Sequence, residues 1–120
     1  MRFLMNENLC SKLQIEEMNE NQLLTCLLSL NALESTILLY LFSHPHSTIK
    51  SMARAVNRHR STVQKALEQL MRQGLALRQT HSLPRGYAYT YTAISKQELK
   101  KAIIQDIKEW SQMIEKKFLS

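Results

Sequence analysis

The chain is poor in the residues that build catalytic and cofactor-binding loops. Its 120 residues include two glycines, two prolines, two cysteines and one tryptophan. A phosphate-cradling loop needs several glycines, so this scarcity argues against a nucleotide-binding enzyme. Neither a nucleophile elbow nor a pair of carboxylates in apolar surroundings is present. We therefore expect a protein that is not an enzyme and that binds no cofactor.

The two cysteines, Cys10 and Cys26, are too few for a zinc site or a disulfide framework. Cys26 lies in the apolar run LLTCLLSL, which predicts a small core residue. Structural disulfides are rare in cytosolic proteins, and no cation cluster beside Cys10 favours a redox-sensing thiol over an ordinary exposed one. His44 and His46 flank a proline in a predicted surface loop, and a single such pair is not a zinc motif. We predict no metal site.

Long uninterrupted apolar runs are also absent. The richest stretch, residues 23–42, contains Asn31, Glu34 and several Ser and Thr residues, so we do not expect it to span a membrane. It predicts instead two core helices, the second starting at a capping box formed by Asn31 and Glu34. The apolar run within residues 1–10 is too short for a signal peptide. These features predict a cytoplasmic protein with no membrane partner.

Acidic residues are scarce in the middle of the chain. The formal net charge is +6. Residues 31–86 hold eight Lys or Arg against two Glu, whereas residues 1–30 carry a net charge of −2 and residues 87–120 a net charge of +2. A polyanion would therefore bind the central segment. An anionic lipid surface is the alternative, but no helix there combines a basic face with a strongly apolar one.

Two short helices joined by a tight turn are predicted between Thr48 and Leu77. Thr48 is a suitable N-cap, and apolar residues follow it at helical spacing. Asn57 tolerates the left-handed backbone of a sharp turn, a second helix starts at Arg60, and Gly74 suits its end. This arrangement is typical of a DNA-reading helix-turn-helix. The inward residues are Ile49, Met52, Ala53, Val56, Val63, Ala66, Leu67, Leu70 and Met71.

The outward face of the second helix carries polar side chains that suit nucleic acid. Arg and Gln pair bidentately with guanine and adenine edges, and Ser suits phosphates or bases. A solvated face on an ordinary helical bundle is the alternative interpretation. The DNA contacts predicted for the turn and this helix are Arg58, His59, Arg60, Ser61, Thr62, Gln64 and Lys65.

After Gly74 the pattern changes from helical to alternating. The run YAYTYTAI has high β-propensity at a period of two, and the turn-rich stretch THSLPRG precedes it. Two strands around this tip predict a β-hairpin, the wing of a winged helix. Tyr87, Tyr89 and Tyr91 share one face, which either packs against the helices, the interpretation we favour, or forms a stacking platform for single-stranded nucleic acid. The DNA contacts predicted for the wing are Arg78, His81 and Arg85.

A long helix is predicted from Lys96 to about Phe118. Ser95 and Glu98 form a capping box at its start. Its apolar positions recur three or four residues apart over a length that the small winged-helix core cannot cover, whereas a symmetric partner helix would cover it. Packing back onto the chain's own residues 9–18 is the alternative. The predicted dimer interface is Leu99, Ile103, Ile107, Trp110, Ile114 and Phe118.

The segment from the first core helices to the wing resembles a known family. RHRSTVQKAL in the second helix and PRGYAYTYTAI in the wing are similar to the winged-helix domain of the archaeal TrmB-like regulators, within the wider MarR-like group. The resemblance covers roughly residues 22–94 and implies sequence-specific binding of double-stranded DNA and regulation of transcription. The chain stops at Ser120 without a sugar-binding effector domain, so we expect a small stand-alone member and do not carry over sugar sensing.

These patterns predict an α+β fold that is mostly α-helical. We expect an N-terminal helical arm over residues 1–21, a winged helix-turn-helix with a two-stranded wing over residues 22–94, and a dimerisation helix over residues 95–120. The predicted function is a homodimeric, sequence-specific transcriptional regulator that binds double-stranded DNA, with the identity of any small-molecule effector left open. The alternatives are an architectural protein that coats DNA without sequence choice and a winged-helix protein–protein interaction module.

Overall fold

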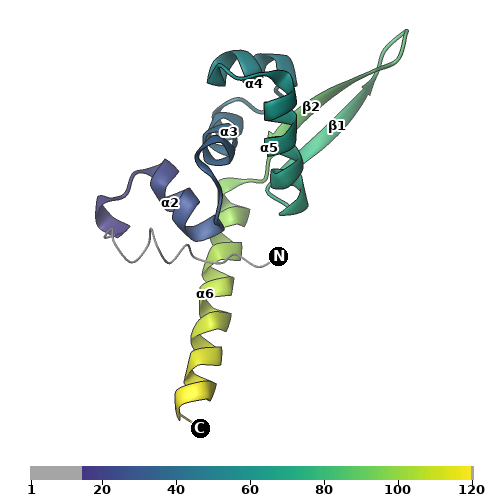
Figure 1. Cartoon of the computed structure of the whole chain (residues 1–120). Coiled ribbons are helices and arrows are strands. Elements are labelled where there is room, and N and C mark those ends of the chain that lie inside the picture. The colour runs from purple at the N-terminus through teal and green to yellow at the C-terminus, as the bar shows by residue number, and fades with distance from the viewer. Residues whose placement is uncertain (1–14, 120) are drawn as a thin grey trace.

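The computed structural model describes residues 15–119, which form an α+β fold as predicted. Most of the elements gather at one end of the molecule, and the last helix runs away from them, so the chain measures 63 × 26 × 21 Å (Figure 1). A short 3₁₀ helix, η1 (Ile15–Glu17), precedes the α-helices. The other elements are α2 (Glu20–Leu28), α3 (Ala32–Ser43), α4 (Ile49–Val56), α5 (Arg60–Arg72), β1 (Ala76–Ser82), β2 (Tyr87–Ala93) and α6 (Lys96–Leu119).

Helices α2 and α3 are the two core helices predicted in residues 23–42, and Leu28, Ile37 and Leu38 on them are almost fully buried. They pack with α4, α5 and the base of the hairpin into one apolar core. Burial of each such side chain contributes about 1.5–3 kcal/mol. Within residues 15–119, no single helix is long and apolar enough to cross a bilayer; α2 and α3 reach that length only as a pair bent by 118°.

Reciprocal caps fix where α2 and α3 begin. Asn19 accepts a hydrogen bond from the Gln22 N–H at 2.8 Å, and the Gln22 side chain accepts one from the Asn19 N–H at 3.1 Å. Asn31 and Glu34 exchange the same two bonds at 2.7 and 3.0 Å, which confirms the predicted capping box. The predicted N-terminal arm lies mostly outside the described residues.

The helix-turn-helix forms as predicted. Thr48 caps α4 by accepting the Ser51 N–H at 3.1 Å. Asn57 ends that helix with φ 55° and ψ 52°, the left-handed conformation expected for the turn. α5 begins at Arg60, and Gly74 follows it with φ 75°. These three residues therefore mark the start of α4, the turn after it and the end of α5.

The Thr48 cap is expected to contribute measurably to stability. Thr48→Ala leaves the Ser51 N–H without its acceptor, so the free energy of unfolding should fall by about 1 kcal/mol. Urea denaturation followed by circular dichroism measures this. Thr48→Ser keeps the hydroxyl and is the matched control; equal losses in the two variants would contradict the cap.

The hairpin is longer than predicted. The two strands pair antiparallel along their whole length, so residues 80–82, which were assigned to the turn, continue β1. The His81 ring bonds the Thr90 hydroxyl across the strands at 2.8 Å, which supports pairing in this polar part. The tip is reduced to four residues, closed by a 3.0 Å bond from the Leu83 N–H to the Gly86 carbonyl, with Gly86 at φ 82°.

The tyrosine face of the wing corrects another expectation. Tyr91 is buried, and its backbone exchanges hydrogen bonds of 3.1 and 2.8 Å with Ser47. Tyr89 and Tyr87 are 43% and 67% exposed, so the favoured interpretation, that the whole stripe packs against the helices, is wrong. The hairpin projects beyond the helical core, and only its base meets α3 (Figure 1). The outer tyrosines therefore remain on the surface.

Cys26 is buried, as its apolar neighbourhood predicted, but it is also disulfide-bonded. This contradicts the expectation of no structural disulfide. That expectation rested on the reducing conditions of the cytosol. Cys10 lies outside the described residues.

His44 and His46 occupy the loop between α3 and α4, as predicted. The His44 ring stacks on Tyr40 with centroids 4.3 Å apart, and Nδ1 of His46 lies 2.9 Å from Oε1 of Gln79. Both rings therefore hold the loop against neighbouring elements. In the described part of the chain, no three His, Cys, Asp or Glu side chains gather as metal ligands.

Candidate nucleic-acid interface

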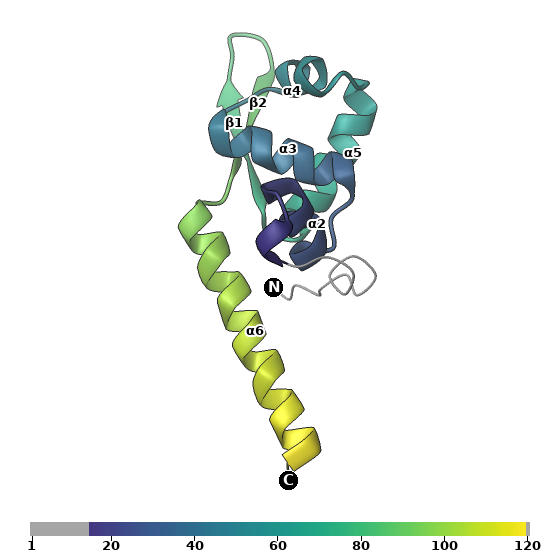
Figure 2. The ribbon, with the colours of Figure 1, turned by 90° about the vertical axis from the view of Figure 1, so that its left-hand side faces the viewer.

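The helix-turn-helix and the wing lie at the end of the molecule opposite the C-terminus of α6. Figure 1 and Figure 2 show this from two directions, with α6 descending away from the other elements. α5 buries Val63, Leu67 and Leu70 against the core, so the opposite side of the helix faces solvent. The fold thus places a polar helix face and a hairpin at the same end of the molecule.

Every residue predicted to contact DNA is exposed. None of these side chains takes part in an ion pair within residues 15–119, so their charges are not neutralised by the protein itself. The exposed candidates in the turn and α5 are Arg58, His59, Arg60, Ser61, Thr62, Gln64 and Lys65, and those in the wing are Arg78, His81 and Arg85.

The N-terminus of α5 offers backbone donors as well as side chains. Side chains cap the starts of the other α-helices among the described residues, whereas His59 makes no side-chain bond to the first turn of α5. The first N–H groups of α5 are therefore open to an external acceptor. Since a helix N-terminus carries partial positive charge, a phosphate oxygen is a suitable acceptor there.

The wing combines cations with exposed aromatic rings. The Arg78 guanidinium lies 4.7 Å from the centroid of the Tyr89 ring, which holds this cation on the tyrosine face. Arg85 lies at the tip between the strands. Residues 69–97 contain no Asp or Glu, so the positive potential of the hairpin is unopposed by its own sequence.

Sequence reasoning missed two further cations at this end of the molecule. Lys50 and Arg54 are exposed on α4, which lies beside the start of α5 (Figure 1). The signal was their spacing of four residues on the polar side of α4, which was interpreted only as a supporting helix. They extend the cationic surface from α5 onto its neighbour.

The wing tip gives a direct test of DNA contact. Arg85→Ala should lower affinity for duplex DNA without changing the fold, with a larger loss at low salt, where charges are least screened. The loss should be greater on duplexes with A·T-rich flanks, because a narrow minor groove concentrates negative potential. Fluorescence anisotropy on duplexes that differ only in flank composition measures both effects.

Arg72→Ala is the matched control for Arg85→Ala. It removes the same charge from an exposed residue in the last turn of α5, at the end away from the wing tip. Overlapping binding curves for the Arg85 variant and the wild type on both flanks would mean that Arg85 at the wing tip does not contact DNA.

α6 presents an apolar face beyond the core. It starts as predicted, with the Ser95 hydroxyl accepting the Glu98 N–H at 3.0 Å. Leu99 is buried in the chain's own core and Ile103 is half-buried. The remaining residues of the predicted dimer interface are between 39% and 81% exposed, and they are Ile107, Trp110, Ile114 and Phe118. We call the six predicted interface positions the α6 stripe.

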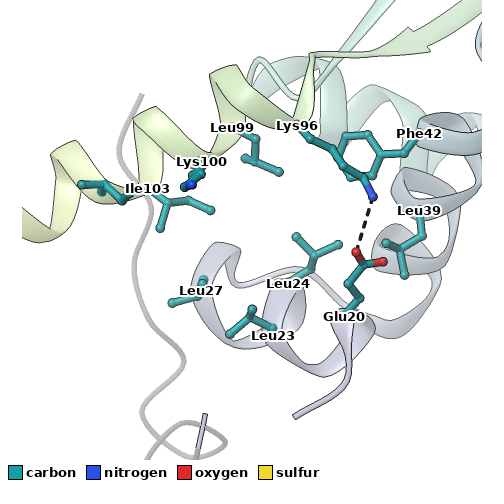
Figure 3. A pocket seen from close by; sticks show the side chains of 11 residues that line it. Glu20, Leu23, Leu24, Leu27, Leu39, Phe42, Lys96, Leu99, Lys100 and Ile103 are labelled. Carbon is teal, nitrogen blue, oxygen red and sulfur yellow. Dashed lines mark hydrogen bonds and ion pairs between the residues drawn. The ribbon is translucent and has the colours of Figure 1, made fainter. Parts of the chain in front are cut away.

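A pocket of about 420 Å³ opens between α2, α3 and α6, where the α6 stripe begins (Figure 3). The Lys96 ammonium lies 3.4 Å from a Glu20 carboxylate oxygen and 5.4 Å from the centroid of the Phe42 ring. Most of the wall is apolar. The pocket is lined by Glu20, Leu23, Leu24, Leu27, Leu39, Phe42, Lys96, Leu99, Lys100, Ile103 and Ile104.

Comparison with known proteins agrees with this geometry. The family model described as the sugar-specific transcriptional regulator TrmB matches residues 24–97. Two uncharacterized proteins of Methanocaldococcus jannaschii, MJ1503 and MJ1082, are 33% identical over 97 residues and 32% identical over 103 residues. The matches cover 80% and 86% of this chain, and 74% and 86% of those proteins.

Solved structures share the fold at lower identity. A possible transcriptional regulator from Methanosarcina mazei Go1 matches with a TM-score of 0.66 and 18% identity, over 77% of this chain and 82% of that one. The ST1889 protein of Sulfolobus tokodaii gives a TM-score of 0.58 and 18% identity, over 72% and 85%. A MepR mutant from S. aureus gives 0.52 and 20%, over 75% and 66%. These neighbours show that the chain has a winged-helix fold.

Proposed function

This chain belongs to the TrmB family of transcriptional regulators, and we propose that it reads a specific double-stranded DNA sequence as a homodimer. Family membership makes it a DNA-binding regulator and not an enzyme. The observation that carries the proposal is the exposed, uncapped first half of α5, beside a wing without acidic residues.

The geometry of α5 suits the major groove. Arg60, Gln64 and Lys65 lie within two turns of one exposed helix face, and the groove is about 12 Å wide, enough to admit a helix. Arg60 can pair with the O6 and N7 acceptors of guanine, and Gln64 with N6 and N7 of adenine. Lys65 and the first N–H groups of α5 would contact phosphates and set the register.

The side chains exposed on α5 favour sequence-specific binding over DNA coating without sequence choice. A coating protein needs only cations for phosphates, whereas an exposed glutamine between Arg60 and Lys65 adds nothing to charge and suits a base edge. The alternative of a protein–protein module is disfavoured by the net charge of +6 in residues 31–86, which suits a polyanion.

The homodimer is supported by the uncovered part of the α6 stripe. Stripe residues separated by three or four positions are exposed along α6 from Ile107 to Phe118. Contiguous apolar surface of this kind marks an interface. A second copy covers it with a stripe of the same composition and leaves the cationic end of each protomer free for DNA.

Selection of bound sites from a random duplex library tests sequence reading. We expect enrichment of a defined motif for the wild type. Gln64→Ala should relax the choice at one base position of each half-site, at a cost of about 1–3 kcal/mol, because the bidentate contact is lost. Measured affinities for duplexes that carry each of the four base pairs at that position give the size of the effect.

Gln112→Ala is the control for Gln64→Ala, since it removes the same side chain from an exposed position on α6. It should leave the selected motif unchanged. A library in which no sequence is enriched while duplex binding persists would support the coating protein, and the absence of any duplex binding would support the protein–protein module.

A further inference from the structure

The spacing of the α6 stripe is the same in both directions along the helix. Its six positions are separated by 4, 4, 3, 4 and 4 residues. The midpoint falls between Lys108 and Glu109. Two further exposed apolar residues, Ile104 and Met113, flank the stripe at its two edges and lie at equal distances from that midpoint along the sequence. The stripe is therefore matched to a reversed copy of itself.

We propose that α6 pairs with α6 of a second copy in antiparallel orientation, and that Phe118 of the partner subunit enters the pocket between α2 and α6. The proposal rests on the homodimer of the proposed function and specifies its geometry. A two-fold axis through the midpoint of the stripe makes the contact isologous, so that each pair of positions occurs twice.

The axis defines which positions meet. At the centre, Ile107 lies opposite Trp110 of the partner subunit. In the next layer, Ile103 lies opposite Ile114 of the partner subunit. In this register an apolar residue of one copy meets an apolar residue of the other in every layer, as antiparallel helix pairs require.

The outermost layer explains both why the pocket is open and why Phe118 is exposed in the isolated protomer. Leu99 lies opposite Phe118 of the partner subunit, and Leu99 lines the pocket. Phe118 is 81% exposed in the isolated protomer. In Figure 3, Leu24, Leu27 and Ile103 border the same open space as Leu99, so an aromatic ring arriving there meets apolar side chains from two helices.

The antiparallel direction also opposes the dipoles of the two α6 helices. Parallel pairing would align these dipoles and leave Phe118 about 28 Å from either pocket, since α6 rises 1.5 Å per residue.

The same geometry separates the DNA-binding ends. In the antiparallel register, the two Lys96 positions where α6 leaves the winged helix are about 38 Å apart, at 1.5 Å per residue. The paired α6 helices thus act as a spacer between the two DNA-binding ends and do not place them side by side.

Cysteine crosslinking distinguishes the two directions. Ile103→Cys and Ile114→Cys proteins are oxidised separately and as an equal mixture, and non-reducing gels are compared with the parental chain, which supplies the background. We expect covalent dimers above this background only in the mixture, because position 103 meets position 114. Strong crosslinking of each variant alone would overturn the antiparallel direction.

Sedimentation of the parental chain separates this proposal from the homodimer itself. A dimer whose cysteine variants do not crosslink in any combination would overturn the register and leave the homodimer standing. A monomer at micromolar concentration would overturn both. Phe118→Ala tests the pocket: we expect the dimer dissociation constant to rise about tenfold or more, with no change for Gln112→Ala on the outward side of α6. An unchanged constant for Phe118→Ala would refute insertion into the pocket.

Discussion

A charge at the centre of the α6 stripe is expected to convert the dimer into a folded monomer. Ile107→Asp places a carboxylate where two copies of α6 meet, and an unpaired buried charge costs about 3–5 kcal/mol. Ile107 is 44% exposed in the isolated protomer, so the winged helix itself tolerates the change. Analytical ultracentrifugation should give the monomer mass at micromolar concentration, with the far-ultraviolet circular dichroism largely retained.

Loss of the dimer should also weaken DNA binding. Two linked DNA-binding domains bind a site made of two half-sites with an avidity about 100-fold or more above the affinity of one domain. The Ile107→Asp variant should therefore lose at least this much affinity for a selected site. Its affinity for a single half-site should match that of the wild type. Gln112→Asp introduces the same charge on the outward side of α6 and should leave mass and affinity unchanged. An Ile107→Asp protein that stays dimeric would exclude α6 as the interface.

The parts of the fold that the sequence predicted well depend on short-range chemistry. Thr48 caps α4, Asn57 adopts the left-handed turn, and Gly74 follows α5, all because each conformation is favoured by the residue and its immediate neighbours. The outward face of α5 was equally predictable. Its apolar residues recur at helical spacing, so the polar residues between them must face solvent.

The parts that were wrong or missed depend on tertiary distances. The alternation of the tyrosines fixed their common face, but exposure of Tyr87 and Tyr89 depends on how far the hairpin extends past the helices. Leu99 shares the spacing of the α6 stripe, but spacing alone does not show that it also packs into the chain's own core, where α2 and α3 reach the first turn of α6.

One local signal in the candidate site was available and overlooked. His59 occupies the N-cap of α5, a position where Ser, Thr, Asp or Asn is preferred and where the other α-helices of the described part of the chain carry Asn, Thr or Ser. A residue that leaves the first N–H groups unpaired is costly for an isolated helix. It is acceptable where an external anion supplies the acceptor, so the missing cap points to the same end of α5 as Arg60 and Lys65.

Removing both cations from that end of α5 is the other change with a large expected effect. If Arg60 and Lys65 each neutralise a phosphate, the double variant Arg60→Ala/Lys65→Ala should lower the slope of log affinity against log salt by about 2. At 0.1 M salt this corresponds to a loss of affinity of about 60-fold, because fewer counterions are released on binding. Affinities from about 0.05 to 0.3 M salt, on a selected site and on a random duplex, give the slope for each.

The pattern of loss across the two duplexes assigns the roles of the two side chains. If Arg60 reads a base, the slope on both duplexes falls by about 1, for Lys65 alone, and the selected site suffers the larger loss because a bidentate contact to guanine disappears. The control is Lys101→Ala/Lys108→Ala, which removes the same two charges from exposed positions on α6. Long-range attraction depends on net charge, whereas counterion release depends on local contact. Equal losses of affinity for the two double variants would therefore show that α5 does not touch the phosphates. A loss of affinity confined to the α5 variant places α5 in the groove.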